Sequence, residues 1–542
     1  MFHWRFISKG RRLAEATNSA RARNVLKGMK KNRPALASPE PPPFRLISEI
    51  RSHELKMRIG PHVQKKGDGT NPNSAMARML PDWNSAPKFA CLSFLILVSM
   101  PLTTMRAEEP PGEAKPERVR LENGVTLLLA PLPEAKIVAV ESFYPVGFCD
   151  EPAGMTQAAH LFEHLMLQGA TKSYAAGESF ALLRKLGMAN AETLPTFTHF
   201  DYTAPSAELG TILQIEGERL TSLKYTPELI SDEADKCNEE AQFVYKNPQS
   251  GMVKHAFMVL FQFWNHGATE VRVRSGLDQI PPAKLEAFYQ AQYRPDQLTI
   301  AIVGGFKEDE ALAMAKEHLG TLSASKSEQK PLNWNSLPAA AHLTWDADVH
   351  AICVYAAPPA EATDRMLLSL WGTALMQKLA VRSNLRELTH MSFSSNTTWP
   401  VGDLPFFVYA TAKSAGKTPE IEKAIKAALQ DATKLLTSDM IQMRMFANMY
   451  AAGPVPSWNE LKAQASAFAK TSGRGEDDAM TMVLLNVALQ WGLRELHGSV
   501  GNEAITEERL KAVLEKALDP AKLRVVTLGP PPETVPQSEP RP

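Results

Sequence analysis

The same order of strand and helix patterns occurs twice along the chain, and this repetition limits the folds it can adopt. The first stretch opens with strand patterns around Asn123-Gly124, a dipeptide that favours hairpin turns, followed by a second apolar strand, KIVAVESFYPVG. Helical patterns then cover 177–186, 206–222 and 226–246, before the apolar strand LTIAIVGGF. Strands on both sides of a run of helices predict one α+β unit, here assigned to residues 108–320.

A fainter version of this order follows residues 321–340, which are rich in Ser, Pro, Lys and Asn and are typical of a linker. It has a strand pattern at HAICVYAAP, helical patterns over 363–386 and 418–436, and a closing strand at LRVVTLG. We therefore predict a structural repeat, with a second α+β unit at 341–528. The Pro-rich tail, 529–542, is expected to be disordered.

The N-terminal segment differs from the rest of the chain in charge. Residues 1–75 contain sixteen Lys or Arg against five Asp or Glu, although the whole chain has a net charge of zero. This segment is Pro-rich and has few aromatic residues, which favours a disordered extension over a nucleic-acid-binding surface. We expect no nucleic-acid partner.

A run of twelve apolar residues at 89–100 follows two basic residues and precedes small ones. It is too short to span a bilayer but suits a secretory signal, so 76–107 is predicted to be a signal peptide and the protein to be exported, to a bacterial periplasm or outside the cell. Residues 1–75 would then be an upstream extension without a folded role. In the alternative interpretation, their arginines form a mitochondrial transit peptide.

The segment AAHLFEHLMLQGA carries the pattern His-x-x-Glu-His. On a helix, His160, Glu163 and His164 fall within an arc of about 100°, so all three side chains point the same way. Two imidazoles at i and i+4 can hold one zinc ion, and a carboxylate beside them can take a proton from the attacking water. A helix whose histidines only pack against neighbours is the alternative, but three titratable groups beside Leu161 and Leu165 are costly to bury without a partner.

A catalytic zinc site needs a third protein ligand, and a second predicted helix, ISDEADKCNEEAQFVYKN, offers candidates. Glu233 and Glu240 are seven residues apart and therefore nearly eclipsed on one face. Asp232 and Glu239 form a second pair at the same spacing, and the helix geometry does not choose between the pairs. The four cysteines, at 91, 149, 237 and 353, show no C-x-x-C spacing, so we expect histidine and carboxylate ligands alone.

These features together resemble peptidase family M16, the pitrilysin or insulinase family, and within it the mitochondrial processing peptidase subunits and bacterial single-chain members. Members of that family carry H-x-x-E-H and, about 75 residues later, a glutamate that is itself preceded by another seven residues earlier. The segments NAETLPTFTHFDYT and YRPDQLTIAIVGGF add to the likeness.

The resemblance implies a zinc endopeptidase that cuts peptides or unfolded protein segments. It also implies an α+β fold in which two homologous units, of the LuxS/MPP-like metallohydrolase type, form a clamshell. His160, His164 and Glu240 would hold one Zn²⁺, Glu163 would be the base and Glu233 an assisting acid. Asn190 and Ala191 match an edge strand that binds substrate, although Pro195 interrupts it and an ordinary turn is the alternative.

The resemblance also implies that an Arg and a Tyr seven residues apart reach the substrate from the second unit. Arg386 matches the Arg, or is a solvated helix residue, whereas Phe393 stands in place of the Tyr. A phenyl ring cannot donate a hydrogen bond to an oxyanion, so we expect a homodimer or a heterodimer with a second M16-like chain. The alternatives are a non-catalytic structural subunit and a module that binds peptides without cutting them.

Overall fold

The computed structural model describes residues 116–246, 276–323, 338–344, 350–381, 388–389, 394–395, 405–432, 455–497 and 505–530. The predicted extension and signal peptide, most of the predicted linker, Arg386 and Phe393 lie outside the described residues. None of the helices within the described ranges is long and apolar enough to cross a membrane.

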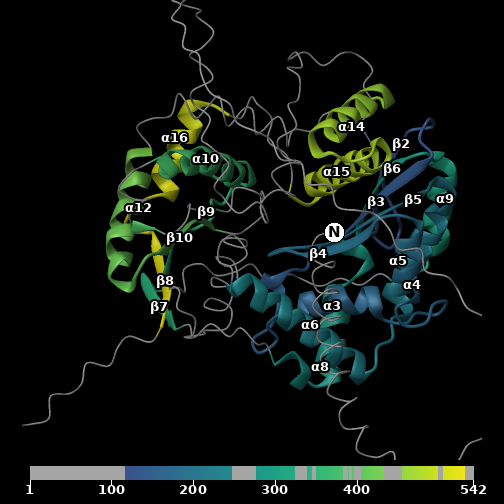
Figure 1. Ribbon diagram of the computed structural model, residues 1–542, viewed down its shortest axis with the longest axis horizontal. Coiled ribbons are helices and arrows are strands. Elements are labelled where there is room, and N and C mark those ends of the chain that lie inside the picture. Colours follow the sequence, from purple (N-terminus) through teal and green to yellow (C-terminus); the bar gives the residue numbers. More distant parts are fainter. Residues whose placement is uncertain are drawn as a thin grey trace, which may run out of the picture. The chain divides into compact units, whose positions relative to one another are not determined.

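A six-stranded sheet forms the centre of the first α+β unit (Figure 1). Its strands are β1 (Glu117–Arg120), β2 (Thr126–Pro131), β3 (Ile137–Tyr144), β4 (Ala189–Thr193), β5 (Thr198–Pro205) and β6 (Thr299–Gly304). They lie in the order β1-β2-β6-β3-β5-β4, and β2 and β6 are parallel whereas all other neighbours are antiparallel. The predicted turn is present, and Gly124 has a φ of 97° there, a conformation that favours glycine.

One face of this sheet is covered by helices that come from the same unit. They are α3 (Ala158–Gln168), α4 (Glu178–Leu186), α5 (Leu209–Ser222), α6 (Pro227–Lys246), α8 (Pro282–Gln292) and α9 (Glu308–His318). Alternate strand residues such as Val140 and Phe200 share one buried core with Phe162 of α3 and Ile212 of α5. Helices α4, α5 and α6 confirm the three helical patterns found in the sequence.

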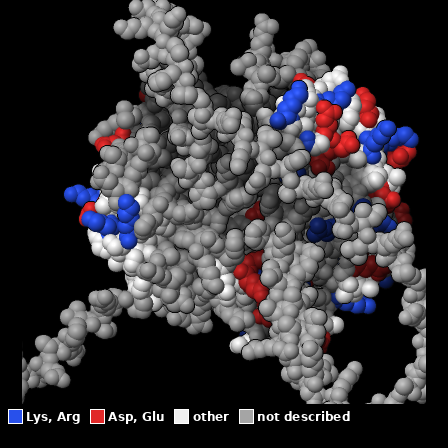
Figure 2. Space-filling model, in the orientation of Figure 1, with Lys and Arg blue, Asp and Glu red and all other residues white. Residues whose placement is uncertain are grey.

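The other face of the first sheet is covered by α14 (Trp458–Ser472) and α15 (Glu476–His497), which come from much later in the chain. Helix α15 packs on β3 and β6. A Cβ on Gly492 would lie 1.8 Å from the ring of Phe143, so the helix approaches the sheet this closely only because that residue is glycine. On the face shown in Figure 2, acidic and basic side chains are intermixed over these helices. The sequence placed residues 341–528 in a second unit and did not predict that α14 and α15 pack on the first sheet.

A second sheet has five strands: β7 (Ala340–Thr344), β8 (His350–Ala356), β9 (Ser394–Ser395), β10 (Phe406–Ala412) and β11 (Arg524–Gly529). Its order is β7-β11-β8-β10-β9, with β7 and β11 parallel and the other neighbours antiparallel. Helices α10 (Ala362–Val381), α12 (Thr418–Ala432) and α16 (Glu507–Ala517) contribute to the core of this unit.

The two sheets share one topology. In each, the closing strand (β6 or β11) lies between an early strand that runs parallel to it (β2 or β7) and an antiparallel strand (β3 or β8). The order then continues outward to β5 and β4 in the first sheet and to β10 and β9 in the second. The predicted structural repeat is therefore confirmed at the level of strand order and direction, although residue-level similarity is faint.

Candidate active site

The position of helix α3 is fixed by a buried acid at its start. Glu151 accepts hydrogen bonds from the backbone N–H groups of Gln157, at 2.8 Å, and Ala159, at 3.0 Å. Gln157 itself has a φ of 69°. Because the first N–H groups of a helix have no partner within the helix, Glu151 satisfies two donors that burial would otherwise leave unpaired. The first turn of α3, which carries His160, is thereby held in place.

The two histidines of the motif lie on one face of α3, and their ring centroids are 4.8 Å apart. On the opposite face, Phe162 and Leu165 are fully buried in the core of the first unit. Burial of the apolar face therefore sets how α3 is turned about its own axis, and this leaves the face with the two histidines outside the core. The side chains of His160 and His164 keep 16% and 14% exposure, so both are within reach of a small solute.

Each imidazole has a polar partner on Nδ1. His160 Nδ1 lies 3.2 Å from Oε1 of Gln157, and His164 Nδ1 lies 3.0 Å from Oε2 of Glu233. When these oxygens accept a hydrogen from Nδ1, the lone pair of each neutral ring is on Nε2, which is the tautomer that a metal ligand needs. Glu233 thus contacts a histidine of the motif from the neighbouring helix, α6.

Both Nε2 atoms face the carboxylate of Glu240 on α6. Oε2 of Glu240 lies 3.3 Å from Nε2 of His160 and 3.9 Å from Nε2 of His164. The competing acidic pair points elsewhere, since Asp232 and Glu239 are exposed. The structure therefore brings Glu233 and Glu240, and neither member of the other pair, to the histidines.

Glu233 is held as a carboxylate by two basic neighbours. Its side chain is only 3% exposed and makes an ion pair with Lys236 in addition to its contact with His164. Burial acts to raise the pKa of Glu233, but the hydrogen bonds and charges of His164 and Lys236 outweigh it and lower that pKa. Glu233 is therefore ionised at neutral pH and can orient the imidazole of His164.

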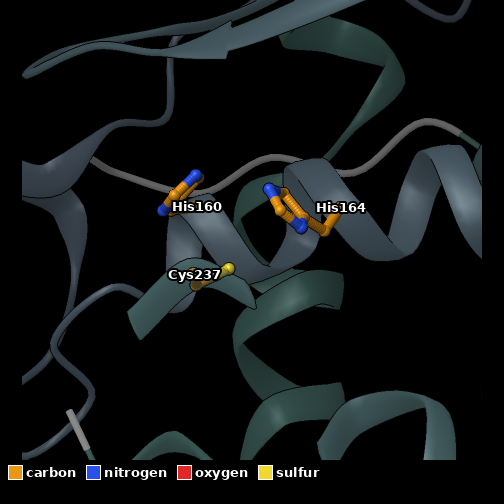
Figure 3. A group of neighbouring side chains, drawn as sticks. All are labelled: His160, His164 and Cys237. Atoms are coloured by element: carbon orange, nitrogen blue, oxygen red, sulfur yellow. The ribbon is translucent and has the colours of Figure 1, made fainter. Parts of the chain in front are cut away.

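The expectation that cysteine takes no part in this site overlooked Cys237. Its Sγ and one nitrogen from each of His160 and His164 all lie within 4.8 Å of one another (Figure 3). Burial acts to raise the pKa of the Cys237 thiol, but attraction and hydrogen bonds to the two imidazoles lower it to about 7. A signal was present in the sequence, because Cys237 is four residues after Glu233 and three before Glu240, on the same helix face.

Both imidazoles have a pKa above that of an ordinary histidine, although burial acts to lower it. Burial lowers the pKa of His160, but Cys237 and Glu240 together raise it to about 10, and Cys237 and Glu233 raise the pKa of His164 in the same way. Negative donors gathered around two rings favour a bound positive charge, whether that charge is a proton or a metal ion. A metal would compete with these protons for the same lone pairs.

Glu163, the third titratable residue of the motif, is held by strand β4. Thr193, the last residue of β4, donates a hydrogen bond from Oγ1 to Oε2 of Glu163 at 2.7 Å. Glu163 is 6% exposed and lies on the same helix as the two histidines. Sequence reasoning missed Thr193, because its distance of thirty residues from Glu163 gives no hint of contact.

Strand β4 is at the edge of the first sheet and contains Asn190 and Ala191. Both residues pair with β5, and Asn190 also donates a hydrogen bond to Asp201 at 3.4 Å. They therefore lie in a strand and not in a turn. The strand ends at Thr193, before Pro195.

Helix α3, with its inverted His-x-x-Glu-His pattern, thus faces the acidic helix α6 within the first of two α+β units that share one topology. Residues 128–268 match the family described as Insulinase (Peptidase family M16), and residues 279–442 match the Peptidase M16 inactive domain. The chain belongs to peptidase family M16.

Among curated proteins, the chain is similar to the zinc protease PqqE of Helicobacter pylori, with 24% identity over 38% of this chain and 47% of that protein. An uncharacterized zinc protease of Mycobacterium leprae is 22% identical over 51% of this chain and 64% of its own length. The matched regions thus span about half to two thirds of these relatives.

Among solved structures, a protease from Helicobacter pylori has the same fold, with a TM-score of 0.55, 18% identity, and coverage of 77% of this chain and 100% of that chain. A peptidase M16 inactive domain from Pseudomonas fluorescens gives a TM-score of 0.54 at 15% identity, over 77% and 98% of the two chains. The predicted fold class is confirmed.

Proposed function

We propose that this chain is a zinc-dependent endopeptidase in which His160, His164 and Glu240 hold the metal. The observation that carries the proposal is the convergence of two Nε2 atoms and one carboxylate oxygen, at 3.3 and 3.9 Å, from two separate helices. The relatives named zinc proteases support the same function.

These three donors fit the requirements of zinc. Ligand atoms about 2.0–2.1 Å from a tetrahedral zinc lie about 3.3 Å from one another, close to the separations found here. The partners on Nδ1 and the ionised Glu233 are the outer contacts that orient metal-binding imidazoles. The donor set therefore suits a catalytic site, in which three protein ligands leave one position for water.

When bound, zinc supplies a Lewis acid that polarises the scissile carbonyl and lowers the pKa of the attacking water. Glu163 accepts the proton of that water and later delivers it to the leaving amine. Thr193 holds Oε2 of Glu163, which leaves Oε1 to take the proton. Glu233 acts on His164 and orients it, without contact with the reacting atoms.

The substrate is a peptide or an unfolded segment of a protein. Strand β4 has a neighbour in the sheet on one side, β5, and an extended peptide can add to the other side as a further strand. Asn190 and Ala191 would contact that peptide. Since Thr193 belongs to the same strand and holds Glu163, the added peptide would be aligned with the base.

Two further parts of the proposal concern the whole protein. The chain is exported, on the basis of the apolar run at 89–100, and it works with a second M16-like chain that supplies the tyrosine absent at Phe393. Arg386 would contact the substrate from the second unit.

The test is digestion of denatured casein by the full chain, before and after removal of metal with a chelator. We expect hydrolysis that is lost with the chelator and restored by zinc. If the protein binds zinc and casein but never cuts it, even with its partner, a peptide-binding module is the better description. A protein that binds no zinc would be a structural subunit.

A further inference from the structure

The hydroxyl of Thr193, which contacts the carboxylate of Glu163, also lies against a second buried threonine. Thr198 is directly opposite Thr193 in the pairing of β4 with β5, and the Oγ1 atoms of the two residues are 3.3 Å apart. Thr198 is fully buried and Thr193 is 3% exposed. Because both side chains are shielded from water, their hydrogen bonds are made within the protein.

Each of these two hydroxyl groups has one hydrogen to donate. Thr193 donates to Oε2 of Glu163 at 2.7 Å, and Thr198 donates to the backbone oxygen of Val146 at 2.8 Å. With its hydrogen directed to Val146, Thr198 presents only lone pairs to Thr193. The Thr193 oxygen thus has two polar contacts, and removal of the Thr198 hydroxyl would take away one of the two that fix its rotamer.

The oxygen of Val146 belongs to the loop that leads into α3, and this loop is joined to the end of β4. The backbone N–H of Phe148 donates to the oxygen of Leu194 at 3.2 Å. A Cβ on Gly147 would lie 2.1 Å from that same oxygen, so the two segments approach this closely only because residue 147 is glycine. The two threonines therefore connect Glu163 to the segment that begins its own helix.

We propose that Thr198 is a positioning residue for the base: it fixes Thr193, and Thr193 fixes the carboxylate of Glu163. This inference rests on the proposed function of Glu163. The contacts run from α3 through β4 and β5 to the loop before α3, so the orientation of the carboxylate is set before a substrate binds. Such an arrangement favours catalysis, since misplacement of a reacting group by about 1 Å can cost on the order of 100-fold in rate.

The test is a double-mutant cycle on casein hydrolysis by the zinc-loaded full chain. Thr193→Val and Thr198→Val each remove a hydroxyl and keep a branched side chain of similar size. We expect Thr198→Val to lower kcat by at least about 5-fold, the effect of one lost hydrogen bond, with KM and zinc content unchanged. The double variant should be no slower than Thr193→Val alone, because Thr198 acts through Thr193. Thr198→Ser, which restores the hydroxyl, should restore kcat.

A purely structural role, in which Thr198 only joins its strand to the loop, is excluded by a matched control. Thr203→Val makes the same change further along β5, where the hydroxyl accepts a hydrogen bond from the backbone N–H of Met188. It should leave kcat unchanged even if it lowers Tm as much as Thr198→Val does. If Thr198→Val does not fold, Thr198→Ala takes its place in the cycle.

A crystal structure of Thr198→Val supplies a measurement that does not depend on activity. We expect the hydrogen bond between Thr193 and Glu163 to be lost, with both histidines of the motif in place. An unchanged Glu163 carboxylate, full kcat in Thr198→Val, or losses that add in the double variant would overturn this inference and leave the proposed function standing. Absence of chelator-sensitive hydrolysis by the unaltered chain would overturn the proposed function and this inference together.

Discussion

Replacement of Glu240 by glutamine tests the choice of the third ligand against a matched control. Glu240→Gln removes the charged oxygen that lies 3.3 Å from Nε2 of His160, whereas Glu239→Gln makes the same chemical change one residue away, on an exposed side chain. The two variants have the same net charge and alter the same helix, so only the position of the lost carboxylate differs between them.

The expected magnitudes follow from the contacts. Glu233 touches the metal site only through His164, and such outer contacts are worth about 10–100-fold in metal affinity, so Glu233→Gln should fall in that range. Glu240→Gln should exceed it, with a loss of more than about 100-fold, or about 2.7 kcal/mol. Glu239→Gln should change zinc affinity by less than about 2-fold, as expected for an exposed carboxylate.

The assay is competition for zinc between each variant and a chromogenic chelator, with circular dichroism to confirm that all variants fold. If Glu239→Gln weakens zinc binding more than Glu240→Gln, the third ligand is Glu239, and the assignment of Glu240 is wrong by one residue. Equal affinities of Glu240→Gln and the unaltered chain would remove Glu240 from the ligand set.

Three other outcomes are expected. Hydrogen bonds from Ser173, Thr171 and Gln214 outweigh burial and lower the pKa of Glu218 to about 2, so its ionised form stabilises the fold above pH 4.5 and that contribution is lost as the pH falls toward 2. Glu218→Gln should therefore cost about 1 kcal/mol in urea unfolding at pH 7, after allowance for solvent screening, and nothing near pH 2. Gly492→Ala should cost about 1–3 kcal/mol through overlap with Phe143, whereas Gly475→Ala, where a Cβ meets nothing within 4 Å, should be nearly neutral. Phe393→Tyr should raise casein hydrolysis by the isolated chain by about 10²–10³-fold, and an unchanged rate would contradict the partner proposal.

Local patterns in the sequence predicted the elements that carry the site. Apolar runs and the Asn123-Gly124 turn marked the strands of the first sheet, and helical spacing gathered His160, Glu163 and His164 onto one face. These predictions succeed because they depend on periods of two and about 3.6 residues, which neighbours along the chain reveal directly.

Contacts between distant segments were not predicted. The apolar face of α15 shows that the helix must pack against something, but it does not show that the partner is the first sheet. Thr193 and Glu151 were missed for the same reason, since each acts on α3 from another segment. Cys237 was overlooked because a search for cysteine pairs ignores a single thiol on the face of an acidic helix.

In the proposed mechanism, Glu163 moves a proton and does not hold the metal. The most direct test is to measure zinc content and casein hydrolysis in one preparation of the full chain with Glu163→Gln, beside the unaltered protein. We expect close to one zinc per chain in both, and hydrolysis in the unaltered protein alone. Loss of zinc from Glu163→Gln, or hydrolysis at the unaltered rate, would contradict the account.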